Sequence, residues 1–372
     1  QYTMNVFCPE CGSRTLLSPE KWRCSCGAAW EPLELARFDP DLVRQSDPSL
    51  WRYHRLYELD FAEPVVRMGT GSTPLLAANL AGREVLLKLE YVAPTASFKD
   101  RGTEVMINVL AHQHVTQVAD DSSGNAGASV AAFAARAGMR AEIYVPAYAS
   151  PAKQAQIAVY GAEVKPVPGP RANAKKAALE AIKRGVVLAS HAYHPGFLLG
   201  QQSLAWELWE QLGRKAPDWY VVPVGQGVHL LGVWLGFKRL HAAGLVKRAP
   251  RMIGVQAKVL APLVEALAAG LDTVPGVTPT SRSLAEGLAI ASPVRGRRLL
   301  QAVRESGGTC LSVSEDAIQA AHRELAHQGL YVEPTSATVV AALPAVVELT
   351  QPGDVIVVPL TGSGLKGSPT LD

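Results

Sequence analysis

The alternation of strand-like and helix-like segments is the feature that most restricts what this chain can fold into. Short runs rich in Val, Ile and Leu have the length and composition of buried strands. Longer segments with helical character follow them. Strands connected in this way pair in parallel, and helices cover both faces of the sheet, so an α/β fold of open, doubly wound sheets is predicted. The expected strands include 85–89, 115–119, 141–146 and 163–165, and the expected helices include 101–112, 122–137, 151–160 and 172–183.

Length and charge limit the classes of protein that fit. The chain has 372 residues, of which 48% are hydrophobic, and single cores stop growing at roughly 250–300 residues, so two main lobes are expected. The net charge is only +3, and no basic block is interleaved with aromatic residues, which disfavours a nucleic-acid partner. Apolar runs such as 337–349 are too short or too interrupted to cross a bilayer. No signal-peptide pattern opens the sequence, and a cytoplasmic location is expected.

Four of the five cysteines fall within the first 26 residues. Cys8 and Cys11 form one closely spaced pair, Cys24 and Cys26 form another, and a glycine follows each pair. Two such pairs can converge on one tetrahedral metal ion, and four thiolates are a common structural zinc set. Two disulfides or four reduced surface thiols are the alternatives. We therefore predict a zinc ribbon over residues 1–30, and a buried apolar role for Cys310.

A lysine in a small, hydroxyl-rich context is the strongest chemical signal. The segment 94–102 reads PTASFKDRG and places Lys99 at the start of a predicted helix. A lysine amine can form a Schiff base with a carbonyl cofactor, and the N–H groups of a helix start can bind an anion. These are the requirements of a pyridoxal phosphate (PLP) site. The alternative is a solvated helix start.

Three further motifs lie where a predicted strand ends, which is where open α/β sheets bind ligands. The first, 121–128, joins a strand to an Ala-rich helix and carries Asn125; a capped helix start is the alternative. The second, 221–232, has a Gly-x-Gly turn before a helix and suits a phosphate group, although a bare turn would look similar. The third, 355–366, offers Thr361 before another Gly-x-Gly, and its alternative is a surface turn.

Taken together, these motifs resemble one family over nearly the whole chain. The sequence resembles threonine synthase and its close relatives among the PLP-dependent enzymes of the tryptophan synthase β-subunit fold, known as fold type II. The N-terminal cysteines resemble the zinc ribbon of many members. The matching segments are TPL at 73–75, PTASFKDRG at 94–102, SGNAG at 123–127, VQA at 255–257, EPTSA at 333–337 and LTGSGLK at 360–366.

The resemblance implies roles for individual residues. Lys99 would form the Schiff base and move protons at the α and β carbons of the substrate. Asn125 would bind the phenolic oxygen of the cofactor, and Thr361 would meet its pyridine nitrogen. The backbone of Gly225, Gln226, Gly227, Val228 and His229 would hold the cofactor phosphate, and Ser97, Ser122, Ser123 and His194 are the candidates for substrate binding.

The resemblance also implies an arrangement of domains. A larger PLP-binding lobe would comprise residues 31–103 and 195–372. A smaller lobe, residues 104–194, would close over a small amino-acid substrate and exclude water. Homodimers are common among such relatives, so a homodimer is expected.

The expected activity is that of a threonine synthase, which converts O-phospho-L-homoserine and water to L-threonine and phosphate by γ-elimination and β-addition. Several residues depart from the family pattern, and the substrate is where they matter. The alternatives are a lyase or synthase for another substituted amino acid, such as a cysteate synthase using O-phosphoserine and sulfite or a threonine or serine dehydratase, and a non-catalytic PLP-binding protein. The departures are Ala93, Ala96, Gln226, Val228, His194 and Ser363.

Overall fold

The chain divides into two compact units. The computed structural model describes residues 4–33 and 36–367. Among these, the first unit contains 4–33, 36–71, 93–200 and 366–367, and the second contains 72–92 and 201–365. The division thus groups 36–71 and 93–103 with the segment expected to form the smaller lobe, whereas the sequence had suggested that they belong to the larger one.

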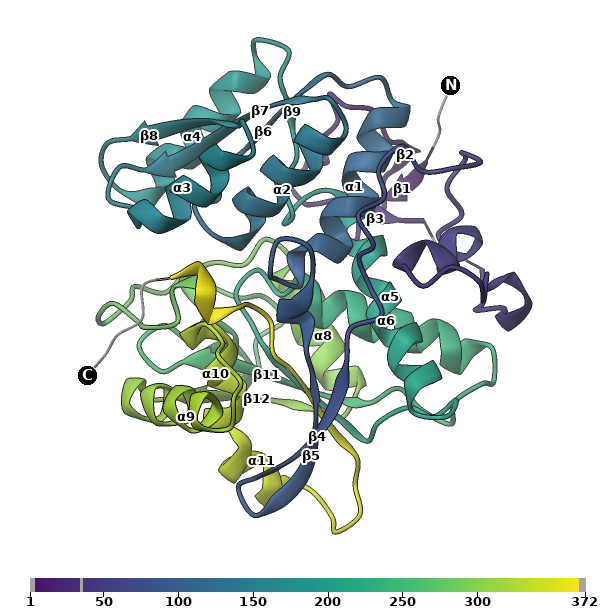
Figure 1. Ribbon diagram of the computed structural model, residues 1–372, viewed down its shortest axis with the longest axis vertical. Helices are drawn as coiled ribbons and strands as arrows, with labels where there is room; N and C mark the ends of the chain where they lie inside the picture. The colour runs from purple at the N-terminus through teal and green to yellow at the C-terminus, as the bar shows by residue number, and fades with distance from the viewer. Residues whose placement is uncertain (1–3, 34–35, 368–372) are drawn as a thin grey trace. The chain divides into compact units, whose positions relative to one another are not determined.

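A four-stranded parallel sheet forms the centre of the first unit, in the order β8-β7-β6-β9. Ala119 and Tyr144 pack with helix α4 on one face. Ile143 lies on the other face, where Gly127 of α2 contacts it. Helices therefore cover both faces, as Figure 1 shows for α2, α3 and α4. The elements are β6 (Gln117–Asp120), β7 (Arg140–Pro146), β8 (Glu163–Val167), β9 (Val187–Leu188), α2 (Asn125–Arg136), α3 (Pro151–Val159) and α4 (Arg171–Ile182).

Helix α1 (Lys99–His112) explains why the preceding segments join the first unit. It packs against α2. The indole of Trp51 donates a hydrogen bond of 2.6 Å to Glu104 in α1. Asn108 exchanges two backbone hydrogen bonds with Val66. The N-terminal part of the unit adds the 3-10 helices Pro40–Leu42 and Leu50–Leu56 and an antiparallel sheet of β1 (Asn5–Phe7), β2 (Arg14–Leu16) and β3 (Glu31–Pro32).

The second unit is built on a six-stranded sheet in the order β12-β11-β10-β13-β5-β4. Its strands are parallel except β4, which pairs antiparallel with β5. The two residues between them, Ala81 and Gly82, have φ values of 51° and 72°. Two positive φ values are what a type I′ hairpin turn requires, and this turn reverses the chain. The strands are β4 (Leu75–Leu80), β5 (Arg83–Lys88), β10 (Trp219–Pro223), β11 (Arg251–Ala257), β12 (Thr309–Val313) and β13 (Ile356–Pro359).

Apolar side chains from the central strands and the covering helices form the core of the second unit, with Val221, Ile253 and Val358 fully buried. The division between the units falls within α5 (Pro195–Gln211), after Gly200. The remaining elements are α6 (Val228–Ala242), α7 (Pro262–Ala268), α8 (Gly296–Glu305), α9 (Glu315–His327), α10 (Pro334–Ala341), α11 (Leu343–Leu349) and the 3-10 helices Glu90–Val92, Glu286–Leu288 and Gly364–Lys366.

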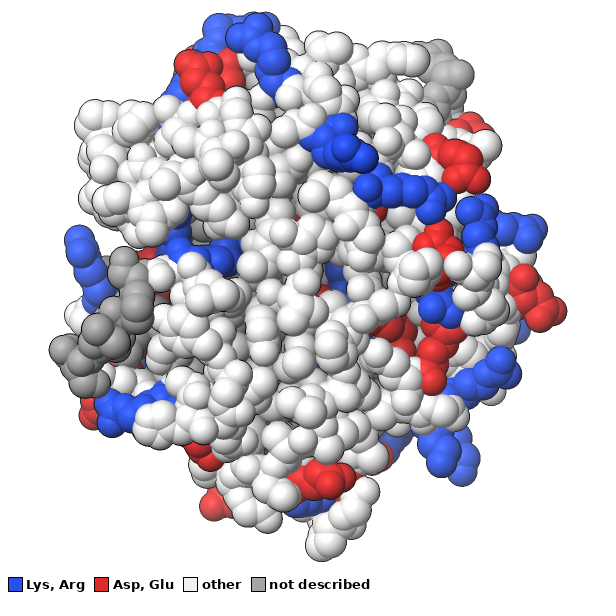
Figure 2. Space-filling model, viewed as in Figure 1, with Lys and Arg blue, Asp and Glu red and all other residues white. Residues whose placement is uncertain are grey.

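The surface is mixed in charge on the face that Figure 2 shows, where basic and acidic side chains are interspersed among uncharged ones. Over the part of the chain that the structure describes, no helix has both the length and the apolar character that crossing a bilayer demands.

Candidate functional site

Lys99 is the first residue of α1, as the sequence motif predicted. Its Nζ lies 4.8 Å from the ring centroid of Phe98 and 5.9 Å from that of Phe197. Phe197 packs so closely on the first turn of α1 that a Cβ at Gly102 would lie 2.5 Å from the ring. The lysine is therefore flanked by two aromatic rings, which lower the polarity around its amine.

A tight turn sets the position of Lys99. Asp100 is fully buried and accepts hydrogen bonds from the backbone N–H of Thr95 (2.6 Å), its hydroxyl (2.5 Å) and Ser129 (2.7 Å). Desolvation raises the pKa of the Asp100 carboxyl, and these donors oppose the rise. Ala96 has a φ of 64°, a left-handed conformation that favours glycine. The turn therefore keeps the backbone conformation of a glycine although an alanine occupies the position.

The loop 121–124 and the first turn of α2 form the second part of the candidate site. α2 begins at Asn125 rather than at the predicted residue 122, because Gly124 is not helical (φ −107°, ψ −145°). Its N–H donates to the hydroxyl of Ser122 over 3.3 Å. Ser122 is buried, and Ser123 and Asn125 are partly exposed. The loop thus combines hydroxyl groups, an amide and the N-terminus of a 12-residue helix, a combination suited to a carboxylate.

Gly127 has no room for a side chain, since an added Cβ would lie 1.9 Å from the carbonyl oxygen of Ser122. We expect Gly127→Ala to push this loop away from α2 and to lower the free energy of unfolding by about 1–3 kcal/mol. Gly124→Ala is the matched control, because its Cβ would approach nothing closer than the Ser122 hydroxyl at 4.0 Å. Urea unfolding of both variants checks this, and equal stabilities would contradict the contact.

The loop after β9 contains two histidines with different surroundings. His194 is buried, and its Nδ1 accepts a 3.1 Å hydrogen bond from the N–H of Gly196, in the first turn of α5. This contact gives His194 a structural role; its role toward a substrate stays a prediction. The buried Nδ1 of His191 and the buried hydroxyl of Ser97 accept or donate no hydrogen bond among the described residues. The sequence pointed to His194 and missed His191, since only the fold gives the two rings different environments.

In the second unit, the loop after β10 has the properties of a phosphate site. Gly227 has a φ of 77° and precedes the 15-residue helix α6. Within the described part of the chain, no backbone acceptor takes the N–H of Gly225, Gln226, Gly227 or Val228. Buried N–H groups are rarely left without a partner, so this run of donors at a helix N-terminus fits an anion.

Two side chains of this loop have their own contacts. The amide oxygen of Gln226 accepts a 3.0 Å hydrogen bond from the N–H of Val294. His229 is buried, and its Nε2 lies 2.6 Å from the hydroxyl of Tyr220. Both contacts support the shape of the loop, which leaves anion binding to the backbone.

Thr361 follows β13, the parallel neighbour of β10, so it shares the carboxyl edge of the sheet with the glycine loop. Its buried hydroxyl lies 3.0 Å from the hydroxyl of Ser336 in α10. The Ser336 oxygen also accepts hydrogen bonds from the backbone N–H groups of Thr361 (3.1 Å) and Gly362 (2.8 Å). Ser336 therefore orients Thr361. The family motif containing Ser336 was recognised in the sequence, but this positioning function was not.

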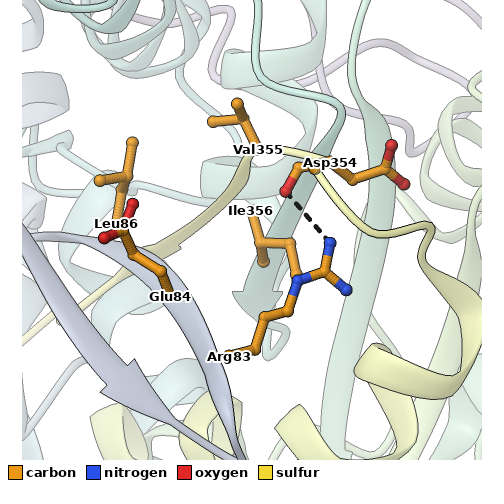
Figure 3. A pocket seen from close by; sticks show the side chains of 7 residues that line it. Arg83, Glu84, Leu86, Asp354, Val355 and Ile356 are labelled. Carbon is orange, nitrogen blue, oxygen red and sulfur yellow. Dashed lines mark hydrogen bonds between the residues drawn. The ribbon is translucent and has the colours of Figure 1, made fainter.

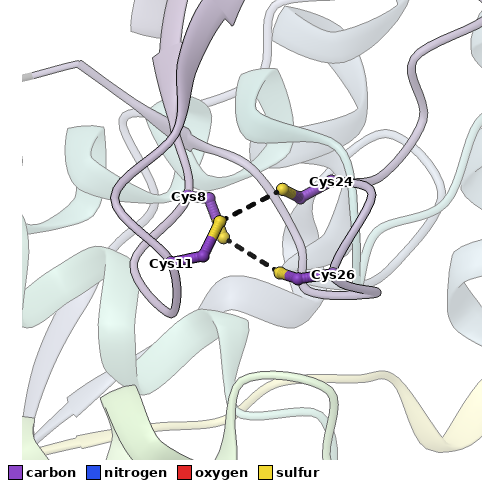
Figure 4. A group of neighbouring side chains, drawn as sticks. All are labelled: Cys8, Cys11, Cys24 and Cys26. Atoms are coloured by element: carbon purple, nitrogen blue, oxygen red, sulfur yellow. Dashed lines mark hydrogen bonds between the residues drawn. The ribbon is translucent and has the colours of Figure 1, made fainter.

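The four N-terminal cysteines gather as the sequence predicted (Figure 4). Their sulfur atoms all lie within 4.8 Å of one another. The Cys8 and Cys26 sulfurs are 3.5 Å apart, and those of Cys11 and Cys24 are 3.6 Å apart. A disulfide needs about 2.05 Å, whereas a tetrahedral zinc ion with Zn–S bonds of about 2.3 Å separates its sulfurs by about 3.8 Å. All four cysteines are free thiols, so the two-disulfide alternative is wrong and the set fits a metal.

A separate pocket lies at the opposite edge of the sheet in the second unit (Figure 3). It is lined by Arg83 and Ile356, the first residues of β5 and β13, and by Asp354. The guanidinium of Arg83 donates to Thr350 over 2.8 Å and to the carbonyl of Asp354 over 3.4 Å. Ligands of parallel sheets bind at the carboxyl ends of strands, so this pocket is not the candidate site.

The fold, the lysine and the glycine loop define the class of a PLP-dependent enzyme of fold type II. Residues 66–362 match the model of the family described as pyridoxal-phosphate dependent enzymes, and the chain belongs to this family. The threonine synthase of Methanocaldococcus jannaschii is 31% identical over 96% of this chain and 92% of that protein. The threonine synthase of Methanosarcina acetivorans is also 31% identical, over 99% and 93%.

A solved structure supports the same class. The crystal structure of a threonine deaminase from T.th. is 29% identical, with a TM-score of 0.69 over 80% of this chain and 94% of that one. The predicted fold class, family and PLP dependence are confirmed. The chain is a PLP-dependent enzyme of the lyase class related to threonine synthases, and the roles of its individual residues remain predictions.

Proposed function

We propose that this enzyme is a threonine synthase, which converts O-phospho-L-homoserine and water to L-threonine and phosphate. The observation that carries the proposal is the similarity to threonine synthases over almost the full length of both chains. Identity of 31% leaves room for another substrate, and the unusual residues of the motifs lie where a substrate would be selected. The substrate is nevertheless a small amino acid, as the family requires.

The chain offers each group that PLP needs. Bound PLP supplies an electron sink for negative charge at the carbon atoms of the amino acid. Lys99 would hold it as a Schiff base, and Asn125 would donate to its phenolic oxygen. The unpaired N–H groups of 225–228, together with His229, would hold its phosphate. Thr361, oriented by Ser336, would offer the ring nitrogen an uncharged partner, which suits elimination better than transamination because it does not force that nitrogen to be protonated.

The protein groups divide the remaining work. The Lys99 amine would remove the α proton and then a β proton, after which phosphate leaves the γ carbon and water adds at the β carbon. Its aromatic neighbours favour the neutral amine by desolvation. Ser122 and Ser123, at the start of α2, would bind the carboxylate. Ser97, whose hydroxyl is buried without a partner among the described residues, is the candidate for a further polar group of the substrate, and His194 is proposed as a second.

A coupled assay tests the proposal. Purified protein is given O-phospho-L-homoserine, and inorganic phosphate and L-threonine are both quantified. We expect equal amounts of the two products. No phosphate release from a protein with bound PLP would overturn the assignment. The similarity to a threonine deaminase makes deamination the second candidate, so L-threonine is supplied separately and 2-oxobutyrate is measured; O-phosphoserine with sulfite tests the cysteate synthase alternative.

We also propose that Cys8, Cys11, Cys24 and Cys26 bind one structural zinc ion. Four protein thiolates would leave no open coordination position for catalysis. The ribbon touches the rest of the first unit through Trp22, whose ring meets that of Tyr193 edge-on at 5.0 Å between centroids. The metal would thereby support the loop that contains His191 and His194.

Loss of the zinc ion is expected to loosen this contact. Cys24→Ser should abolish zinc binding, measured as metal per chain by mass spectrometry, and lower the melting temperature. Ser25→Ala is the matched control, since Ser25 is exposed between two ligands. A Cys24→Ser protein with a full complement of zinc would contradict the proposed site.

A homodimer is the proposed assembly, supported by the resemblance to threonine synthases. Light scattering measures the mass in solution, for which a monomer would have 39.6 kDa. A monomer at all concentrations would contradict the proposal.

A further inference from the structure

Asp120 is a buried acid close to the candidate catalytic lysine. It is the last residue of β6 and is fully buried. It pairs with Ile143 of β7, so its side chain leaves the sheet on the same face as Ile143. That face is covered by α2, which packs against α1, the helix that begins with Lys99. Neither carboxylate oxygen hydrogen-bonds to a side chain among the described residues, so the acid is placed there without a structural partner.

His191 lies beside Asp120 through the adjacent strand. β6 and β9 are parallel neighbours, and the N–H of Ala189 donates to the carbonyl of Ala119 over 2.8 Å. His191 follows two residues later. Its enclosed Nδ1 has no hydrogen-bond partner in the described part of the chain. Two chemically active groups thus meet Lys99 from two strand ends, and neither serves the packing of the unit.

The electrostatic environment couples these groups. Desolvation, followed by the charge of Asp121, raises the pKa of Asp120 to about 8, while Lys99 and the N–H groups of Asp121 and Ser122 oppose the rise. Desolvation, followed by Lys99 and Arg171, holds the pKa of His191 well below its ordinary value. His191 is therefore neutral, and Asp120 is the group that can balance a positive charge on Lys99.

We propose that Asp120 is a positioning residue that sets the charge on the Lys99 nitrogen, both as a free amine and when it holds PLP. The inference rests on the proposed role of Lys99. An ionised carboxylate beside a buried nitrogen stabilises its protonated form, and a neutral acid does not. The two groups therefore titrate as a pair. Asp120 would keep a proton available to Lys99 during the proton transfers of the reaction.

Titration of the PLP-loaded, full-length protein tests this proposal. The visible absorbance of the bound cofactor reports the protonation of the Lys99 nitrogen and is followed across the neutral and alkaline range. In Asp120→Asn we expect the midpoint of this titration to move to lower pH by about one unit or more, because an opposite charge has been removed. Asp121→Asn is the matched control, since it removes the same charge from the neighbouring, partly exposed residue and should move the midpoint less.

An unchanged midpoint in Asp120→Asn, or equal shifts in the two variants, would overturn the proposal. Asp120→Ala is the second variant in case the amide disturbs folding, because it removes the charge without leaving a polar group to satisfy. Circular dichroism verifies that each variant is folded. A Lys99→Ala protein that keeps the absorbance band would refute the proposed role of Lys99 itself, whereas a band that needs Lys99 but ignores Asp120 refutes only this inference.

Discussion

Replacing Lys99 by alanine is expected to reduce formation of L-threonine and phosphate from O-phospho-L-homoserine by at least about 10³-fold, since the variant loses both a nucleophile and a proton carrier. The fold should survive, because Lys99 occupies the first position of α1, where Asp100 and its three hydrogen bonds hold the turn. The visible absorbance of the bound cofactor should be lost together with activity.

The matched control is Lys176→Ala, which removes an exposed lysine from α4 of the same unit. We expect this variant to keep activity and absorbance. Circular dichroism and the thermal melt should be similar in both variants and in the unmodified protein. Activity retained in Lys99→Ala would refute the assignment of the catalytic lysine, and with it the alignment of the motif to the family.

The fold class could be predicted because its signals are local. Buried parallel strands are short apolar runs, and the helices between them are long enough to recognise, so the strand at 141–146 and the helix at 151–160 were located within one residue. The start of α2 was misplaced by three residues because the unusual conformation of Gly124 depends on its contacts. The antiparallel strand β4 was not predicted, although the Ala81-Gly82 turn is a recognisable hairpin signal.

The candidate site was predictable only where a motif is continuous in sequence. Lys99, Asn125 and Thr361 each lie in such a motif. Ser336, which orients Thr361, lies 25 residues before it. Glu104 receives hydrogen bonds from Trp51 and from Thr70, which precede it by 53 and 34 residues. Partners at such separations are set by tertiary packing, which no local pattern encodes.

Asp120 shows the same limit from another side. The sequence places Asp120 and Asp121 next to each other and gives no reason to distinguish them. The strand register buries the first and leaves the second partly exposed. Burial is what changes the chemistry, because desolvation raises the pKa of Asp120 to about 8. A residue of this kind becomes visible only once the sheet is known.

The second large effect is expected for Glu207→Ala, which should lower the free energy of unfolding by about 3–5 kcal/mol because it leaves a buried ammonium group without its carboxylate. Lys88, at the end of β5, is fully buried, and its Nζ bonds to Glu207 as well as to the Thr73 carbonyl (2.6 Å) and Gln211 (2.8 Å). Glu207 also accepts from the N–H groups of Ser72 and Thr73, each over 2.9 Å. Its loss therefore frees the segment before β4.

Urea unfolding followed by circular dichroism measures the change. Glu210→Ala is the control on the same helix, since Glu210 is partly exposed, and its effect should stay within about 0.5 kcal/mol. The double variant Lys88→Met/Glu207→Leu should recover much of the lost stability, because well-packed apolar residues often replace a buried ion pair at little cost. A double variant no more stable than Glu207→Ala would show that Glu207 acts through its backbone contacts to Ser72 and Thr73 and not through the charge of Lys88.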